Sequence, residues 1–263
     1  MRIVDHKYQG AVMAPSPNFT NRVITPRFIV MHYTAGWEVG SALRTFANAN
    51  SDVSAQFTID VDGTIYQHVD CNIRAWHAGP SSYAGFKDLN SHSIGIEFVN
   101  PGFLRKVGEN LYQDAHGTRV SGDTVGPMVA APSRRAGSGT FYWPAYTKEQ
   151  IEAGEAVTRA LIEAYGIVDI VSHEEIDTRG WKTDPGPAFP MSRFKALLPT
   201  QASSVVTFVV NADVLNVRAG PASSHPVKRT LSRGARVFQH ARRGAWVQIG
   251  NDEWVNSAFL RAA

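Results

Sequence analysis

The segment Arg27-Phe-Ile-Val-Met-His-Tyr33 is apolar at nearly every position. A strand with one solvated face alternates apolar and polar residues, whereas a strand covered on both faces is apolar throughout. The segments Ser93–Val99 and Ile167–Ser172 have the same character. The three segments therefore predict buried strands, the first two of them at the centre of a sheet.

Segments with helical spacing lie between these strands. Ser41–Ala49 has its apolar residues on one side, and Thr147-Lys-Glu-Gln150 has the form of a capping box before a helix that Gly166 ends. Gln56–Ile59 and Thr64–His68 flank a glycine-containing turn, which predicts a β-hairpin. We expect an α/β fold with a mixed central β-sheet flanked by helices.

The chain changes character near residue 200. We expect one domain over residues 1–199, a polar linker over residues 200–204 and a second domain over residues 205–263. Short strands broken by turns fill the second domain, which predicts a small all-β barrel. Within the first domain, residues 102–146 are rich in Gly, Ser, Arg and Pro without clear periodicity. We expect this insertion to be a functional lid or a mobile excursion.

Composition limits the possible classes of protein. The chain has 43% hydrophobic and 19% charged residues, which is typical of a soluble globular protein. Its single cysteine, Cys71, excludes an internal disulfide and a multi-cysteine zinc site. No stretch approaches the roughly 20 apolar residues that a bilayer-spanning helix needs. Residues 1–9 lack the apolar core of a secretory signal.

Charge is distributed unevenly between the two predicted domains. Residues 205–263 carry eight Lys and Arg against three acidic residues, whereas the rest of the chain carries 18 basic and 20 acidic residues. A cationic second domain suits an anionic polymer or surface. The alternative is a solvated basic face that serves only solubility.

Three distant residues can form one metal site. His32 and His173 each end an apolar segment, and Asp184 lies in Lys182-Thr-Asp-Pro. Two imidazoles and a carboxylate are a ligand set of catalytic zinc, which keeps its fourth position for water. Taken alone, this set is weak, because the chain contains 9 histidines.

The sequence around these residues resembles the zinc-dependent N-acetylmuramoyl-L-alanine amidases of the type 2 family, which are relatives of peptidoglycan recognition proteins and of the T7 lysozyme. The resemblance covers residues 27–198 and rests on seven segments in the family's order: Val30-Met-His-Tyr-Thr-Ala35, Val53-Ser-Ala-Gln-Phe57, Asp62-Gly-Thr-Ile65, Arg74-Ala-Trp-His-Ala-Gly79, Ser93-Ile-Gly-Ile-Glu97, Ser172-His-Glu-Glu-Ile176 and Lys182-Thr-Asp-Pro-Gly-Pro-Ala-Phe189.

The resemblance implies a role for each site residue. It makes His32, His173 and Asp184 the ligands of Zn²⁺, which activates water for attack on an amide. Glu97 matches the family's catalytic glutamate and would act as general base, the alternative being a surface acid near a strand end. Lys182, two residues before Asp184, would stabilise the oxyanion, the alternative being a solvated lysine.

Further positions concern the substrate. His77 and Trp76 match family positions near the substrate cleft, and we expect both to contact substrate, although a packed structural histidine is equally compatible with the sequence. Gln56 replaces a histidine found in many relatives. Tyr33 follows a ligand on a strand, so its side chain is expected in the core.

The second domain resembles a bacterial SH3-like cell-wall domain. The resemblance rests on Leu215-Asn-Val-Arg-Ala-Gly-Pro221, Leu231-Ser-Arg-Gly-Ala-Arg-Val237, Gly244-Ala-Trp-Val-Gln-Ile249 and Glu253-Trp-Val-Asn-Ser-Ala-Phe-Leu260. A linked wall-binding domain raises the concentration of an enzyme on an insoluble substrate. A barrel that only stabilises the enzyme or binds another protein is the alternative.

These features predict a peptidoglycan hydrolase that cleaves the amide between N-acetylmuramic acid and L-alanine, acting as a lysin on polymeric cell wall. The alternatives are a non-catalytic recognition protein and a cytoplasmic amidase that recycles anhydro-muropeptides. We expect peptidoglycan as the partner, no nucleic acid, no membrane insertion and a monomer. The lysin would act in the periplasm or outside the cell, reaching the wall through a holin-type pore or a secretion machine.

Overall fold

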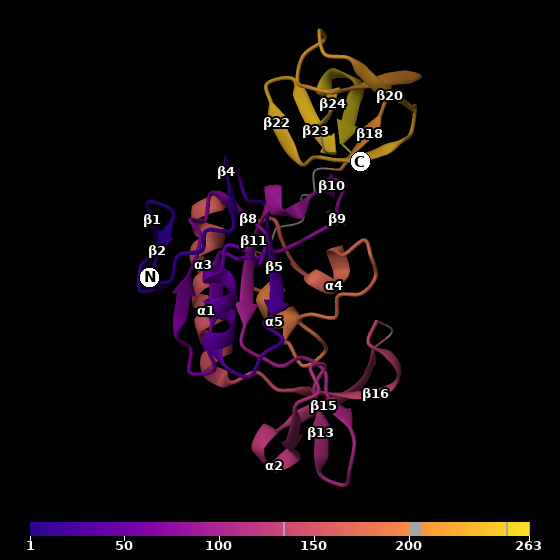
Figure 1. Cartoon of the computed structure of the whole chain (residues 1–263). Coiled ribbons are helices and arrows are strands. Elements are labelled where there is room, and N and C mark those ends of the chain that lie inside the picture. The colour runs from indigo at the N-terminus through magenta and orange to yellow at the C-terminus, as the bar shows by residue number, and fades with distance from the viewer. Residues whose placement is uncertain (134, 200–206, 251, 263) are drawn as a thin grey trace. The chain divides into compact units, whose positions relative to one another are not determined.

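The computed structural model describes residues 1–133, 135–199, 207–250 and 252–262. The chain forms two compact units (Figure 1). The first unit consists of Met1–Tyr83 and Asp88–Leu198, and the second consists of Ala84–Lys87 and Pro199–Ala263. The linker predicted at residues 200–204 lies outside the described residues, as do the first two residues of the strand expected from Val205.

A six-stranded mixed sheet forms the centre of the first unit. Its strand order is β17-β5-β11-β6-β7-β3, and β5 lies parallel to both β17 and β11. β6 and β7 form the expected antiparallel hairpin. The strands are β3 (Val12–Met13), β5 (Phe28–Tyr33), β6 (Phe57–Ile59), β7 (Ile65–Gln67), β11 (Ser93–Phe98) and β17 (Asp169–Ser172). The three predicted strands are thus neighbours, with β5 and β11 inside the sheet and β17 at its edge.

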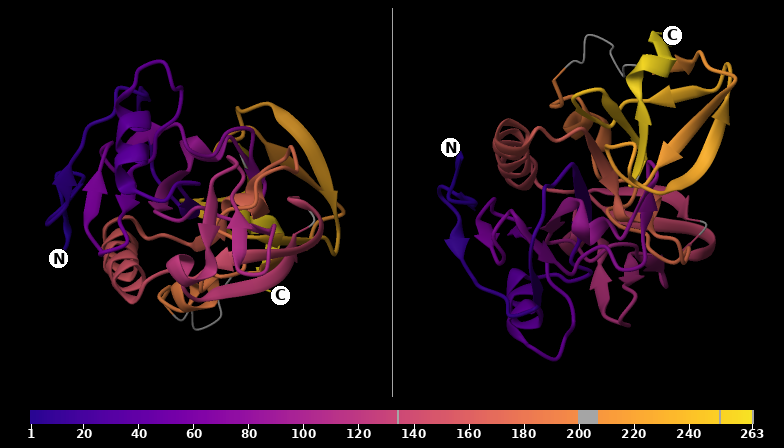
Figure 2. Two further views of the ribbon diagram at one scale, coloured as in Figure 1. Left: turned by 60° about the horizontal axis from the view of Figure 1, so that its bottom comes forward. Right: turned by 90° about the horizontal axis from the view of Figure 1, so that it is seen from above.

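One face of this sheet packs against the long helix α3 (Lys148–Tyr165). Thr147 and Gln150 form the predicted capping box, and Gly166 follows the helix in the left-handed conformation. The shared core contains Ile29, Met31, Ile94, Ile96 and Phe98 from the sheet and Ile151, Val157 and Leu161 from α3. The left view of Figure 2 shows α3 and α1 (Val39–Ala47) on opposite sides of the sheet.

The other face of the sheet carries the polar residues of the same strands. Because side chains alternate along a strand, His32 and Glu97 point away from the core that Met31 and Phe98 enter. Glu97 lies directly beside His32 in the register of β11 and β5. The face opposite α3 is therefore where the predicted site residues gather.

The insertion at residues 102–146 has regular structure of its own. It forms one three-stranded sheet and one hairpin, with Leu104, Phe141 and Trp143 buried. Most of its strands span only two or three residues, which is too short for a periodic pattern to appear. Its elements are β12 (Arg105–Lys106), β13 (Leu111–Gln113), β14 (Arg119–Ser121), α2 (Gly122–Val125), β15 (Met128–Ser133) and β16 (Gly137–Pro144).

Short elements complete the first unit. The segment before β5 contains several brief strands, of which β3 joins the central sheet and β4 pairs with β8. These elements are β1 (Ile3–Val4), β2 (Lys7–Tyr8), β4 (Phe19–Val23), β8 (Ile73–Ala75), β9 (Ser82–Tyr83), the 3-10 helix Leu89–Ser91, α4 (His173–Ile176) and α5 (Met191–Lys195).

The second unit is all-β where described, as predicted. A three-stranded sheet β21-β18-β25 and a five-stranded sheet β20-β19-β24-β23-β22 enclose Val210, Leu215, Val217, Val247 and Val255. Its elements are β10 (Phe86–Lys87), β18 (Thr207–Val210), β19 (Val214–Arg218), β20 (Val227–Ser232), β21 (Arg236–Phe238), β22 (Ala241–Arg243), β23 (Trp246–Gly250), β24 (Glu253–Asn256), the 3-10 helix Ser257–Phe259 and β25 (Leu260–Ala262). Among the described residues, no helix has the length and apolarity to cross a bilayer.

Candidate metal centre

His32, His173 and Asp184 converge on one point, although 152 residues separate the first from the last. The Nδ1 atoms of the two histidines lie 3.0 Å apart, and the Asp184 Oδ2 lies 3.0 Å from His32 Nδ1 and 2.9 Å from His173 Nδ1. All three side chains are buried. We call these three residues the metal cluster.

The geometry of the metal cluster fits a tetrahedral zinc ion. Bonds of ~2.0–2.1 Å place any two ligands of such an ion ~3.3 Å apart. The three observed separations are slightly shorter than this, so a small outward relaxation would accommodate an ion. Two imidazole nitrogens and one carboxylate oxygen leave a fourth position for water.

The ends of neighbouring parallel strands bring the cluster together. His32 is the penultimate residue of β5, and His173 directly follows β17, whose residues Val171 and Ser172 pair with Val30 and Met31. Carboxyl ends of parallel strands form a common edge where ligands bind in open α/β sheets. Asp184 is joined to the same edge, because the Glu174 backbone N–H donates to the Asp184 carbonyl over 3.0 Å.

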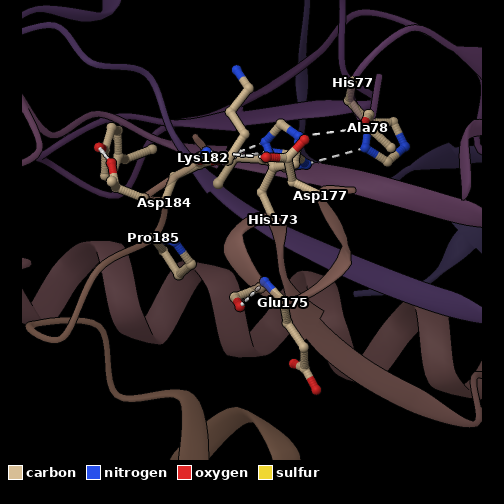
Figure 3. Close-up of polar contacts among 12 residues, drawn as sticks. His77, Ala78, His173, Glu175, Asp177, Lys182, Asp184 and Pro185 are labelled. Carbon is tan, nitrogen blue, oxygen red and sulfur yellow. Dashed lines mark hydrogen bonds and ion pairs between the residues drawn. The ribbon is translucent and has the colours of Figure 1, made fainter. Parts of the chain in front are cut away.

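A main-chain carbonyl determines which ring nitrogen of His173 carries a hydrogen. Its Nε2 lies 3.3 Å from the carbonyl oxygen of Ala78 (Figure 3). A carbonyl can only accept, so Nε2 must carry the hydrogen and Nδ1 keeps its lone pair for a metal.

A series of hydrogen bonds determines in the same way which ring nitrogen of His32 carries a hydrogen. Ser93 Oγ donates to the Leu89 carbonyl over 2.6 Å, so it must accept from His77 Nε2, which lies 3.4 Å away. Burial, together with the nearby His32 and His173, lowers the pKa of His77 well below its usual value. Neutral His77 then accepts at Nδ1 from His32 Nε2 over 3.1 Å. His32 therefore presents an unprotonated Nδ1 to the cluster.

The absence of a side chain at Gly95 allows the His77 ring to take its place in these hydrogen bonds. A Cβ at Gly95 would lie 2.6 Å from the His77 Cγ, so the imidazole rests directly against the backbone of β11. The Asn90 side chain fixes the other side, because its Oδ1 accepts from the backbone N–H groups of His77 and Ala78. Sequence reasoning did not identify Gly95, Asn90 or Ser93, although the first and last lie in a matched segment.

The cluster is electrostatically prepared for a cation. Burial and then His173 lower the pKa of His32 to about 4, which keeps its imidazole neutral at neutral pH. Burial acts to raise the pKa of Asp184, but the contacts of its carboxylate with the His173 and His32 rings outweigh burial and hold that pKa below the usual range. An imidazole nitrogen without a hydrogen and an ionised carboxylate are the forms that coordinate zinc.

Glu97 lies beside the cluster with one oxygen unused. Its Oε2 is buried and has no hydrogen-bond partner among the described residues. Burial and then the charge of Asp184 raise its pKa well above the usual value, while Lys182 opposes this effect. A buried carboxyl with a free oxygen is costly to keep without a role, which argues against a mere surface acid.

The cluster, Glu97 and Lys182 line a cleft of about 370 Å³. Trp76 and His77 also line it, so all the predicted site residues lie in one hollow. His77 is buried and packed as described above, and its contact with substrate remains a prediction, as does that of Trp76. Among the described residues that line the cleft, none comes from residues 102–146.

Two other expectations met different outcomes. Tyr33 is half-buried, with its ring against Gly102 and its hydroxyl hydrogen-bonded to the Thr183 hydroxyl, so it points away from His32 as expected. Gln56 is fully buried, with Oε1 accepting from the Gly95 N–H and Nε2 donating to the Ile73 carbonyl. Gln56 thus supports β11 below the cluster.

Comparison with known proteins agrees with this geometry. Residues 22–187 match the model of the N-acetylmuramoyl-L-alanine amidase family. The chain belongs to this amidase family. Residues 213–261 match the model of the bacterial SH3 domain.

Amidase relatives of known name align with the first unit. The 1,6-anhydro-N-acetylmuramyl-L-alanine amidase AmpD of Enterobacter cloacae is 34% identical over 161 residues, which is 60% of this chain and 64% of that protein. AmpD of Escherichia coli is 33% identical over 215 residues, covering 74% of this chain and 95% of that protein. A crystal structure of a selenomethionine AmpD derivative superimposes with a TM-score of 0.52 at 28% identity, covering 75% of this chain and 99% of the other.

Proposed function

We propose that this protein is a zinc-dependent amidase that hydrolyses the bond between the lactyl group of N-acetylmuramic acid and the L-alanine of the stem peptide. The observation that carries this proposal is the convergence of three ligand atoms within about 3 Å of one another on the floor of a cleft. Membership of the amidase family gives the bond type. The acid at position 184 completes a ligand set suited to hydrolysis.

His32, His173 and Asp184 would hold the ion. When bound, zinc supplies an activated water and polarises the amide carbonyl. The ring orientations of His32 and His173 are fixed by His77 and by the Ala78 carbonyl, so both imidazoles meet the ion without reorganisation.

Glu97 is proposed as the general base. Its unpartnered oxygen can take a proton from the attacking water and deliver it to the departing L-alanine amine, so that the amide C–N bond breaks with a neutral leaving group. Lys182, on the same cleft, would stabilise the negative charge that develops on the carbonyl oxygen.

The substrate is proposed to be polymeric cell wall. A second hollow of about 630 Å³ shares Trp76, His77, Trp181 and Lys182 with the cleft, so the groove continues beyond the metal cluster. A groove longer than one site suits a chain-like substrate. The domain matched to bacterial SH3 domains, with its basic excess, would hold the enzyme on an anionic wall outside the cytoplasm.

A recycling amidase is the second candidate. The relatives named above are called 1,6-anhydro-N-acetylmuramyl-L-alanine amidases, which favours a soluble anhydro-muropeptide as substrate. A recognition protein without turnover is the third, and it would retain the metal cluster.

Purified protein incubated with sacculi and, separately, with soluble anhydro-muropeptides tests these alternatives. We expect new L-alanine amino termini from sacculi, their loss with a chelator and their return with added zinc. Mass spectrometry of the released fragments should find intact stem peptides that begin with L-alanine. Turnover restricted to soluble anhydro-muropeptides would favour the recycling amidase. Absence of turnover with both substrates would favour the recognition protein.

A further inference from the structure

The insertion at residues 102–146 contacts the segment that carries Asp184, on a side away from the cleft. The tip of its β15–β16 hairpin holds Arg135, whose side chain is only 23% exposed. The Arg135 guanidinium donates to the Lys182 carbonyl over 3.1 Å. It also lies 3.6 Å from the Asp177 carboxylate and 3.8 Å from that of Glu174.

Asp177 organises the turn that leads to Asp184 (Figure 3). Its side chain is fully buried, and its Oδ2 accepts from the backbone N–H groups of Trp181 and Lys182. Its Oδ1 accepts from the backbone N–H and the Nε of Arg179. Arg135 therefore contacts both the Asp177 carboxylate at the centre of this turn and the carbonyl of Lys182, two residues before Asp184.

Two aromatic residues of the same insertion support the other side of Asp184. The Tyr146 hydroxyl, directly after β16, donates to the Pro185 carbonyl over 2.8 Å. The Trp143 ring lies so close to Gly186 that a Cβ there would be 2.5 Å from it. The segment from 182 to 186 is thus held at its beginning by Arg135 and at its end by Trp143 and Tyr146.

We propose that the insertion is a brace for the third metal ligand and that Arg135 is a positioning residue within it. Asp184 lies on a segment without regular structure, so its carboxylate would otherwise sample many positions and lose affinity for the metal. Groups that orient a ligand without touching the metal typically change metal affinity by about 10- to 100-fold. The proposal rests on the zinc site of the proposed function.

The test compares Arg135→Ala and Arg135→Lys with native protein. Arg119→Ala, at an exposed arginine of β14 in the same insertion, is the matched control. Zinc affinity is measured by competition with a chromophoric chelator, and hydrogen exchange is followed in residues 177–186 of the metal-free proteins. Turnover of sacculi gives kcat and KM.

We expect Arg135→Ala to weaken zinc binding by about tenfold and to increase hydrogen exchange in residues 177–186. We expect it to lower kcat more than it changes KM, because Asp184 and Lys182 are displaced together. Arg135→Lys keeps the charge near Asp177 but loses the planar fork, so it should restore part of the affinity. Arg119→Ala should match the native protein.

Unchanged zinc affinity in both Arg135 variants would overturn the role of Arg135, whatever their thermal stability. If Arg135→Ala failed to fold, Arg135→Lys would decide, because native affinity in that variant would equally overturn the proposal. Native protein that binds no zinc would overturn the metal site itself. The two failures are therefore distinguishable.

Discussion

Glu97 and Asp184 are two carboxyls that line one cleft and have opposite electrostatics. Contacts with two imidazole rings keep Asp184 ionised, whereas burial favours the protonated form of Glu97. Such divergence separates a metal ligand from an acid–base group. The two residues should therefore fail in different ways when they are replaced.

Replacement of Glu97 should separate binding from turnover. We expect Glu97→Gln to retain zinc at native stoichiometry and to lower kcat by about 10²–10⁴-fold, since the general base is lost. Metal analysis and the release of L-alanine amino termini measure the two effects. Asp184→Ala is the control and should lose zinc and activity together. Near-native turnover in Glu97→Gln would show that another group is the base.

Ser93 tests the hydrogen-bond chain behind His32. In Ser93→Ala, His77 loses its acceptor at Nε2, so its orientation and that of His32 become less fixed. We expect zinc affinity to fall by about tenfold, as for other groups behind metal ligands. Ser16→Ala removes a buried serine hydroxyl that donates to the Phe46 carbonyl instead and should leave zinc affinity unchanged. Equal zinc affinities in the two variants would show that the hydrogen bonds from Ser93 through His77 do not orient His32.

At the scale of elements, α3 and the sheet approach each other closely at Gly154. A Cβ at this position would lie 2.6 Å from the Phe98 ring, which is fully buried. Phe98 follows Glu97 on β11, so this contact sets the depth at which the end of β11 sits below the cleft.

Gly154→Ala should therefore destabilise the protein. Overpacking costs about 1–3 kcal/mol, whereas alanine gains ~1 kcal/mol over glycine in a helix, so we expect a net loss of up to ~2 kcal/mol. Urea unfolding of the metal-free protein measures it. Glu163→Ala, on the exposed side of α3, should change stability by less than ~0.5 kcal/mol. Stabilisation by Gly154→Ala would mean that Phe98 can move aside freely.

At the scale of the whole molecule, buried titratable groups should make the metal-free protein sensitive to acid. Burial lowers the pKa of His32, His77 and His68. As pH falls below about 6.5, the unfolded state binds protons at these groups before the folded state does, so stability falls as pH falls. Glu97 opposes this trend, because burial raises its folded pKa and the folded state retains its proton.

The three histidines act in one direction and Glu97 alone acts in the other. We therefore expect the unfolding free energy to decrease by roughly 1–3 kcal/mol for each unit by which pH falls below about 6.5. Urea titrations at several pH values, with chelator present, measure the slope. Glu97→Gln should make the slope steeper, since it removes the opposing group. A flat profile in both proteins would contradict the assigned protonation states.

The second unit carries a pair of arginines suited to an anionic polymer. Arg236 and Arg261 both pair with Val209, from opposite sides of β18, so they share one face of the three-stranded sheet. Two strand spacings separate their backbones by ~9.5 Å. Both side chains are exposed.

The double variant Arg236→Glu, Arg261→Glu should lower the fraction of protein that sediments with sacculi at low salt, because attraction becomes repulsion. Hydrolysis of a soluble muropeptide should not change. Exchange of the charges in the exposed Arg233–Asp213 pair keeps the net charge and serves as control. If the double variant sediments as well as native protein, this face of the sheet does not bind the wall.

The amino-acid sequence determined the buried strands, the capped helix, the all-β second unit and the identity of the residues that meet in the cleft. These follow from short-range patterns, since apolar runs, capping residues and family segments are each local. It also predicted that Lys182 and Asp184 share the cleft, because two residues span one repeat of an extended chain.

Only the tertiary structure decided how those residues are oriented. The Ala78 carbonyl behind His173, the path from His32 through His77 to Ser93, and the grip of Arg135 on the Lys182 carbonyl all join segments far apart in the chain. No local pattern encodes such contacts, because each depends on where two independently folded segments meet. The sequence thus named the residues of the metal cluster, and packing between distant segments fixed which atom each one presents.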